Sequence, residues 1–230
     1  MQVLVIAPHP DDETIGAGGT IARHVAGGDE VSLCVVTQGY SPPWPADIVE
    51  TARRQVEAAR KVLGTKRVFF LGFPTVKLNT VPNADLTGAL QKVVDEIRPE
   101  VVYTPSASDV NQDHRIVFEA TLVACRPLPG GIVKRVLCYE TVYSSRYGHE
   151  PFAPNVFVDI EPFLGKKLEA MKCYETELRE PPHPRSLAGL ELIARERGLS
   201  VGLKAAECFQ LVREIQPDTD KRRVNRGGRR

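Results

Sequence analysis

Short apolar runs alternate with segments of helical spacing four times in the first half of this chain, and this alternation limits the possible fold most strongly. The apolar runs are residues 3–7, 30–37, 67–71 and 101–104, and the helical segments are 14–26, 47–63, 84–97 and 113–124. Strands connected by helices in this way pair in parallel through right-handed crossovers. A strand that helices cover on both faces is continuously apolar, as Val68-Phe69-Phe70-Leu71 is. The pattern predicts an α/β fold with a Rossmann-like, mostly parallel sheet and helices on both faces.

The pattern changes after residues 126–131, which are rich in proline and glycine. We expect further strands at 133–139, 156–160 and 208–212, a long helix from 161 to about 178, and another helix at 186–197. These elements would form a C-terminal cap region on the same sheet. We therefore expect residues 1–215 to form a single domain. Residues 216–230 are basic and lack periodicity, which predicts a disordered tail.

Charge and cysteine content narrow the class of protein. The formal net charge is +1, but six Lys and Arg residues lie in 221–230, so the preceding 220 residues carry a net −5. A mildly acidic body argues against a nucleic-acid partner. The five cysteines are scattered without a C-x-x-C pair, which is typical of a reducing cytoplasm, and no run approaches the roughly 20 apolar residues of a transmembrane segment. We expect a cytoplasmic protein with a small-molecule or glycoconjugate substrate, and a homo-oligomer remains possible.

Two polar loops follow strands that should be neighbours in such a sheet. The hexapeptide Pro8-His9-Pro10-Asp11-Asp12-Glu13 follows the first strand, and residues 109–115 follow the fourth. Loops after the strands on either side of the switch point face one crevice, so we expect His9, Asp12 and His114 to converge. Two imidazoles and one carboxylate suit Zn²⁺, with a free position for water whose pKa falls to about 7. Adjacent aspartates cannot easily bind one ion together, which leaves Asp11 as the candidate base.

Simpler interpretations exist for parts of this region. Asp11 or Asp12 could cap the helix that begins near Thr14, because carboxylates accept hydrogen bonds from free amides there. The glycines of residues 16–19 could belong to a dinucleotide-binding fingerprint. That fingerprint, however, needs its first glycine directly after the strand and an acidic residue at the end of the second strand, and this chain has neither. We interpret these glycines as close packing of the helix against the sheet.

Several motifs together resemble the PIG-L/LmbE-type zinc-dependent N-deacetylases over most of the chain. They are residues 8–13, 18–20, 53–57, 70–72, 113–115, 154–160 and 182–186. The resemblance implies removal of an acetyl group from an N-acetylated amino sugar of the N-acetylglucosamine type, with release of acetate and the free amine. It implies Zn²⁺ as the cofactor, with ligands His9, Asp12 and His114. Asp11 would be the general base, and Asp113 would orient a neighbouring catalytic group.

The chain departs from the family pattern at Asn111, where many members have a histidine that is thought to stabilise an oxyanion. The amide of Asn111 could donate a hydrogen bond in its place, or His183 could supply the missing imidazole. Arg53 or Arg54 would bind the substrate, as an arginine on the corresponding helix does in the family. Arg185 is a further candidate for substrate binding. For these arginines the simpler interpretation is pairing with acidic neighbours.

The departure at Asn111 also leaves other functions open. An amidase that acts on another sugar or thiol conjugate would use the same metal chemistry, because the loops around a site select its substrate. A catalytically impaired metal-binding or sugar-binding protein is the alternative outside the enzymes.

Overall fold

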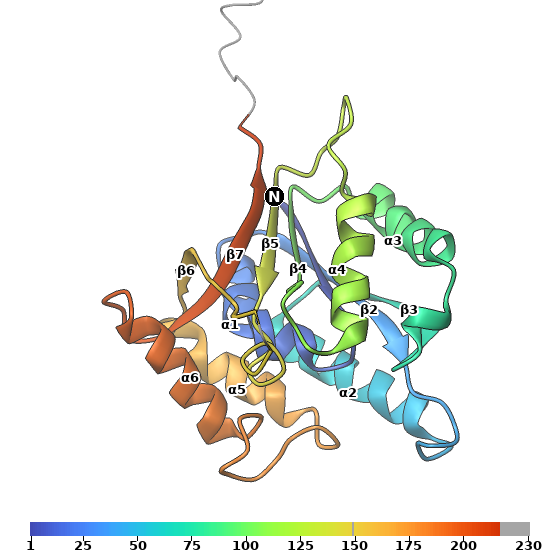
Figure 1. The fold of residues 1–230 in the computed structure, drawn as a ribbon. Coiled ribbons are helices and arrows are strands. Elements are labelled where there is room, and N and C mark those ends of the chain that lie inside the picture. Colours follow the sequence, from blue (N-terminus) through green and yellow to red (C-terminus); the bar gives the residue numbers. More distant parts are fainter. Residues whose placement is uncertain (149, 217–230) are drawn as a thin grey trace, which may run out of the picture.

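In the computed structural model, the seven strands of the described residues belong to one sheet, in the order β3-β2-β1-β4-β5-β7-β6 (Figure 1). The structure describes residues 1–148 and 150–216. The first five strands run parallel, whereas β7 is antiparallel to both β5 and β6. The strands are β1 (Gln2–Ala7), β2 (Glu30–Gln38), β3 (Arg67–Pro74), β4 (Val101–Pro105), β5 (Arg135–Tyr139), β6 (Val156–Asp159) and β7 (Ala206–Glu214).

Helices cover both faces of the sheet. They are α1 (Asp12–Ala26), α2 (Ile48–Leu63), α3 (Asn83–Ile97), α4 (Gln112–Ala124), α5 (Leu164–Lys172) and α6 (Leu187–Leu199), with 3₁₀ turns η1 (Leu78–Thr80) and η2 (Glu161–Phe163). Val3 and Val5 of β1 share a core with residues of α1, α2, α5 and α6, whereas Leu4 and Ile6 share a second core with α3 and α4. Successive side chains of a strand point to opposite faces, so the continuously apolar strand fills both cores. The predicted fold class is confirmed.

The strand order places the two polar loops together. From β1 the chain builds outward to β2 and β3, and it then crosses back to add β4 on the other side of β1. Val5 of β1 is paired with Tyr103 of β4, so the carboxyl ends of these strands are adjacent. This is the switch point of a doubly wound sheet, where such folds bind their ligands.

Two glycines of α1 allow that helix to pack closely on its neighbours. A Cβ atom at Gly16 would lie 2.2 Å from the ring of Tyr139, and one at Gly19 would lie 2.8 Å from the side chain of Ile160. Neither position has room for a side chain. The structure confirms that these glycines serve helix packing.

The prediction of one long helix from 161 to about 178 is wrong. The chain makes the turn η2, and α5 then ends at Lys172. Beyond it, the side chain of Tyr174 is fully buried and its hydroxyl donates to Glu13, while the hydroxyl of Thr176 donates to Gln55 on α2 at 2.9 Å. These tertiary bonds and the following prolines replace the helix with an irregular segment from residue 173 to 186, which lies next to the predicted site.

A buried ion pair connects the middle of α1 to the C-terminal elements. Glu207 of β7 accepts hydrogen bonds from the backbone amides of Gly19 at 2.9 Å and Thr20 at 2.7 Å. Lys167 of α5 donates to the same carboxylate at 2.6 Å and to the carbonyl of Ile15 at 2.7 Å. The side chains of Lys167 and Glu207 are each 4% exposed. Part of the hydrogen bonding of α1 therefore comes from residues far along the chain.

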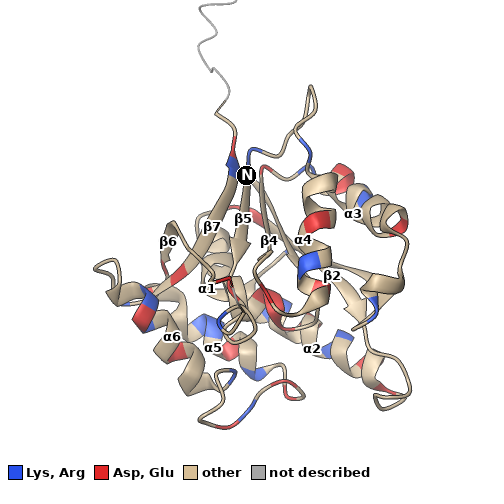
Figure 2. Cartoon of the chain, viewed as in Figure 1, with Lys and Arg blue, Asp and Glu red and all other residues tan. Residues whose placement is uncertain are grey.

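The outer surface carries charges of both signs. Figure 2 shows lysines and arginines interspersed with acidic residues along the visible helices. Within the residues that the structure covers, no helix is both long and apolar enough to cross a bilayer. The predicted tail lies, from residue 217 onward, outside the described residues, and the cytoplasmic location stays a prediction.

Candidate metal centre and active site

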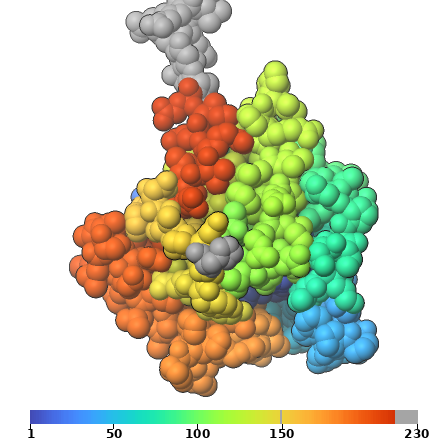
Figure 3. Space-filling model, viewed as in Figure 1, coloured from blue at the N-terminus to red at the C-terminus, as the bar shows by residue number. Residues whose placement is uncertain are grey.

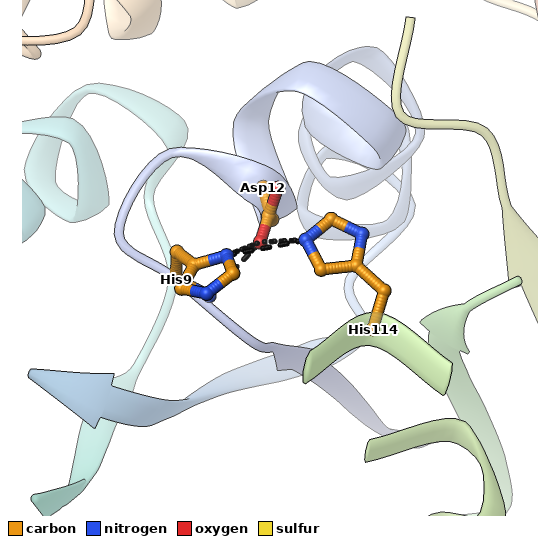
Figure 4. Close-up of side chains that lie close together, drawn as sticks. All are labelled: His9, Asp12 and His114. Atoms are coloured by element: carbon orange, nitrogen blue, oxygen red, sulfur yellow. Dashed lines mark hydrogen bonds and ion pairs between the residues drawn. The ribbon is translucent and has the colours of Figure 1, made fainter. Parts of the chain in front are cut away.

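The three predicted metal ligands converge at the switch point (Figure 4). His9 follows β1, Asp12 begins α1 and His114 lies in the first turn of α4. Nδ1 of His9 is 3.1 Å from Nε2 of His114, and Oδ2 of Asp12 is 3.2 Å from each of these nitrogens. Ligands bound tetrahedrally at about 2.0–2.2 Å lie about 3.4 Å from one another. The donor set and its spacing therefore fit a divalent ion of the zinc type.

A second carboxylate holds each histidine ring in position. Nε2 of His9 lies 3.1 Å from Oδ2 of Asp113, and Nδ1 of His114 lies 3.0 Å from Oδ2 of Asp109. A carboxylate on the outer nitrogen fixes the tautomer of an imidazole, so its inner nitrogen presents a lone pair to the metal. Asp113 is thus beside the predicted ligand His9, where it can orient the ring of that histidine.

Asp109 is the centre of a buried hydrogen-bond cluster that the sequence analysis did not assign. Its Oδ2 accepts from the hydroxyl of Ser144 at 2.8 Å and from that of Thr141, and its Oδ1 accepts from the amide of Asn111 at 2.8 Å. The side chain of Asp109 has no exposed surface. The signal available in the sequence was an aspartate five residues before His114 in the same loop.

The charges around the three ligands favour a cation. Burial opposes a proton on His114, but Asp12 and Asp109 outweigh burial and raise the pKa of His114 to about 10. Burial likewise raises the pKa of Asp12, but His114 and His9 outweigh that effect and hold it well below its ordinary range. A field that holds a proton so strongly at this point also attracts a divalent ion.

Asp11 has a strained backbone and does not cap α1 through its side chain. It occupies the N-cap position of α1, yet its side chain makes no capping hydrogen bond. Its φ is 102°, in the left-handed region that residues other than glycine rarely adopt. Burial and the neighbouring charge of Asp12 raise the pKa of Asp11 well above its ordinary value, against the opposing effect of Arg185.

The site opens into a cavity of about 310 Å³. In Figure 3, blue atoms of the N-terminal segment are visible in a recess between the green and orange parts of the chain. Of the predicted site residues, six line this cavity: His9, Asp11, Asp12, Asn111, His114 and Arg185. Trp44 and Tyr143 add aromatic rings to its wall.

Arg185 bridges two acidic residues at the cavity wall. Its Nη1 donates to Oδ2 of Asp11 at 3.2 Å and to Oε2 of Glu177 at 3.1 Å. Its guanidinium carbon lies 5.4 Å from the centre of the Tyr143 ring. Arg185 is therefore both paired with acidic neighbours, as the simpler interpretation holds, and in contact with the predicted base. Glu177 was missed because it falls in the segment that was predicted to be helical.

Asn111 and His183 differ in their access to the cavity. The side-chain oxygen of Asn111 caps α4 by accepting from the amide of Asp113 at 3.0 Å, which leaves its NH₂ group to donate elsewhere. His183 does not line the cavity, and its Nδ1 accepts from the amide of Arg185 at 3.0 Å. Its ring lies 5.9 Å from that of Tyr143. Of the two proposed oxyanion donors, the structure brings Asn111 to the cavity.

The structure does not bring Arg53 or Arg54 to the cavity. Both side chains are exposed on α2, and the guanidinium of Arg53 lies over the ring of Phe70, 5.1 Å from its centre. The neighbouring Gln55 is buried and lines the cavity instead. Successive residues of a helix are rotated by about 100° about its axis, so neighbouring side chains point in different directions. The face of α2 that packs on the core therefore determines which side chain reaches the site.

Known deacetylases are similar to this chain in sequence. A family model described as PIG-L, GlcNAc-PI de-N-acetylase, matches residues 4–125. The uncharacterized deacetylase YaiS of Escherichia coli (strain K12) is 31% identical over 180 residues, which cover 76% of this chain and 90% of that protein. The probable N-acetyl-alpha-D-glucosaminyl L-malate deacetylase 2 of Bacillus anthracis is 25% identical over 185 residues, with coverage of 76% and 80%.

A solved structure extends the similarity to the whole fold. The conserved protein TT1542 from Thermus thermophilus superposes with a TM-score of 0.75 at 28% identity, and the match covers 94% of this chain and 97% of that one. The chain belongs to the PIG-L family of deacetylases.

Proposed function

We propose that this protein is a zinc-dependent hydrolase that removes the acetyl group from an N-acetylated amino sugar of the N-acetylglucosamine type, releasing acetate and the free amine. The observation that carries the proposal is the convergence of His9, Asp12 and His114 beside the buried Asp11 at one cavity wall. The name of the Bacillus anthracis relative, which refers to an N-acetylglucosaminyl compound, supports this substrate class. The cavity volume of about 310 Å³ is at the lower end of the range for small-molecule sites.

Two nitrogens and one carboxylate oxygen form the donor set of hydrolytic zinc sites, and His9, Asp12 and His114 would hold the ion. When bound, zinc would act as a Lewis acid toward the acetamide carbonyl and would make water more acidic. The contribution of Asp113 would be to fix the ring of His9, and that of Asp109 would be to fix the ring of His114.

Asp11 would move the proton. A carboxylate with a raised pKa can accept a proton from the attacking water at neutral pH and return it to the departing amine. Its strained backbone directs the side chain into the cavity instead of toward the amides of α1. Arg185, which donates to Oδ2 of Asp11, would keep that carboxylate in place and would add positive charge to the cavity wall.

Asn111 would stabilise the negative charge that develops on the carbonyl oxygen. Its side-chain oxygen is already engaged by the amide of Asp113, so the NH₂ group is the part that can donate. One such donor generally contributes about 10²–10³ in rate. The faces of Trp44 and Tyr143 would contact the apolar side of the sugar ring.

The test is the release of acetate from a panel of N-acetyl amino sugars, with the purified protein measured before and after treatment with a chelator. We expect release that stops on chelation and returns with zinc. Asp11→Asn should lower kcat by at least about 10²-fold while the metal content stays the same. The exposed Asp95 of α3 provides the matched control, and Asp95→Asn should release acetate at the parental rate.

Two other outcomes would refute the proposal. Release of a different acyl product would identify an amidase for another conjugate. Metal-bound protein that releases nothing from any amide would identify a metal-binding or sugar-binding protein without turnover.

A further inference from the structure

Val76 is strained at the rim of the cavity. Its φ is 58°, its side chain is 68% exposed, and it lines the opening of the site. A β-branched residue in the left-handed region is an outlier, because its Cβ crowds the backbone there. Such a conformation persists only where neighbouring interactions enforce it, and an exposed side chain supplies few of them. The backbone of residue 76 must therefore be held by other contacts.

Asp113 supplies those contacts. Its Oδ2 accepts from the amide of Val76 at 2.6 Å, and its Oδ1 accepts from the amide of Leu78 at 3.3 Å. The same Oδ2 lies 3.1 Å from Nε2 of His9. Both carboxylate oxygens are thus fixed by backbone amides, and one of them is directed at a proposed metal ligand.

Residues 76–78 make two further contacts, one through Leu78 and one through Lys77. The side chain of Leu78 is 1% exposed and belongs to the core between the sheet and helices α3 and α4. Nζ of Lys77 lies 4.1 Å from the centre of the Tyr40 ring, which packs edge-on against Trp44 on the cavity wall. Residues 76–78 therefore connect the rim of the cavity, the hydrophobic core and the carboxylate behind His9.

We propose that residues 76–78, which we call the latch, position His9 for metal binding by holding the carboxylate of Asp113. This inference rests on the metal site of the proposed function. With the latch in place, Asp113 can accept only in the direction of Nε2 of His9, so Nδ1 faces Asp12 and His114. Without the latch amides, the Asp113 side chain is free to rotate and the ring of His9 loses its fixed orientation. The strain at Val76 is the cost of directing its amide at this carboxylate.

Two substitutions at one position separate the amide from the side chain. In Val76→Pro the N–H donor is lost, and proline cannot adopt a positive φ. In Val76→Gly the donor is kept, and glycine adopts a positive φ readily. Zinc affinity is measured by competition with a chelator of known affinity, and thermal unfolding after metal removal reports on folding. We expect Val76→Pro to bind zinc about 10–100-fold more weakly, the range found when such supporting groups are lost. Val76→Gly should stay within about threefold of the parent, because it keeps the bond.

Arg98 provides a control for backbone strain alone. It also has a positive φ, 53°, at the end of α3, and it does not line the cavity of the site. Arg98→Gly should leave zinc affinity unchanged. Equal affinity of Val76→Pro and the parent would overturn the proposal, and so would an equal loss in Val76→Gly. A parent protein that binds no zinc would instead refute the metal site itself.

Amide hydrogen exchange gives a test that needs no variant to fold. If the latch and the metal stabilise one another, zinc must slow exchange of the Val76 and Leu78 amides, because coupling between two sites is reciprocal. The amide of Glu191 on α6 should exchange at the same rate with and without zinc. Exchange at Val76 and Leu78 that does not respond to zinc would overturn the proposal.

Discussion

Replacing Asp109 by asparagine should weaken metal binding by about 10–100-fold while preserving the fold. Oδ2 of Asp109 accepts hydrogen bonds from two hydroxyl groups and lies 3.0 Å from Nδ1 of His114. Its Oδ1 accepts a hydrogen bond from the backbone amide of Asn111 at 2.8 Å. Asparagine has the same shape but carries an NH₂ group on one side. Whichever way its amide turns, that NH₂ group faces at least one donor, and the negative charge behind His114 is lost.

The size of the effect follows from the bond that is lost. A hydrogen bond between an N–H group and a charged acceptor contributes about 1.5–3 kcal/mol. Because about 1.4 kcal/mol corresponds to a tenfold change in an equilibrium constant, the expected loss is about one to two factors of ten in zinc affinity. The site is buried, so this bond is poorly screened by solvent and salt.

The assay is competition for zinc against a chelator of known affinity, with thermal unfolding of the metal-free protein measured in parallel. Asp95→Asn is the control, since Asp95 lies exposed on α3 and accepts only from Gln91 at 2.9 Å among the described residues. A zinc affinity of Asp109→Asn within about twofold of the parent would refute the role of Asp109 in fixing His114. An equal loss in Asp95→Asn would show that the effect is not specific to the site.

Two further predictions concern the oxyanion donor and the response to pH. Asn111→Ala should lower kcat by about 10²–10³-fold at unchanged metal content, and unchanged turnover in both Asn111→Ala and His183→Ala would contradict each assignment of the oxyanion donor. Burial raises the pKa of Glu140, but hydrogen bonds from Arg197 and Arg146 outweigh it and hold that pKa below its ordinary value. The stabilisation by Glu140 is therefore present above its unfolded-state pKa and is lost as the pH falls through the lower folded-state pKa. The difference in unfolding free energy between the parent and Glu140→Gln, measured by denaturant titration, should shrink between pH 6 and pH 3, and a difference that grows on acidification would contradict this reasoning.

The sheet and the convergence of His9, Asp12 and His114 could be predicted because each depends on a rule of topology. Alternating apolar runs and helices specify parallel strands, and the order of a doubly wound sheet then brings the loops after β1 and β4 together. His9 and His114 are 105 residues apart in the sequence, yet their ring nitrogens lie 3.1 Å apart. Local propensities cannot show that these two residues are close in space, whereas the strand order places the loops that carry them side by side.

The supporting residues of the site could not be predicted in the same way. The apolar spacing of α5 continues as far as Leu178, so the local pattern favours a helix there. The helix ends because Tyr174 and Thr176 bond to Glu13 and Gln55, which are far away in the sequence. Such partners have no characteristic spacing.

The arginines of α2 show a different limit. The resemblance to the family identified the helix but not the rotation of this chain's helix about its axis. Val56, Ala59 and Leu63 form the buried face, so Gln55 turns toward the cavity while Arg53 turns to solvent. Arg53 and Gln55 lie at opposite edges of the apolar stripe, so helical periodicity alone does not decide which of them faces the cavity.

The bonds from Glu207 and Lys167 to α1 determine where this chain can be divided. The first four strands with their helices look like a complete unit, and the turn-rich residues 126–131 would be a natural place to cut. A fragment ending there would leave the amides of Gly19 and Thr20 and the carbonyl of Ile15 without the partners they have in the intact chain. The fragment would then lack the buried ion pair that joins the middle of α1 to α5 and β7. We therefore expect that two fragments of this protein, as used in complementation experiments, restore the native conformation of residues 8–13 only when the second fragment includes α5 and β7.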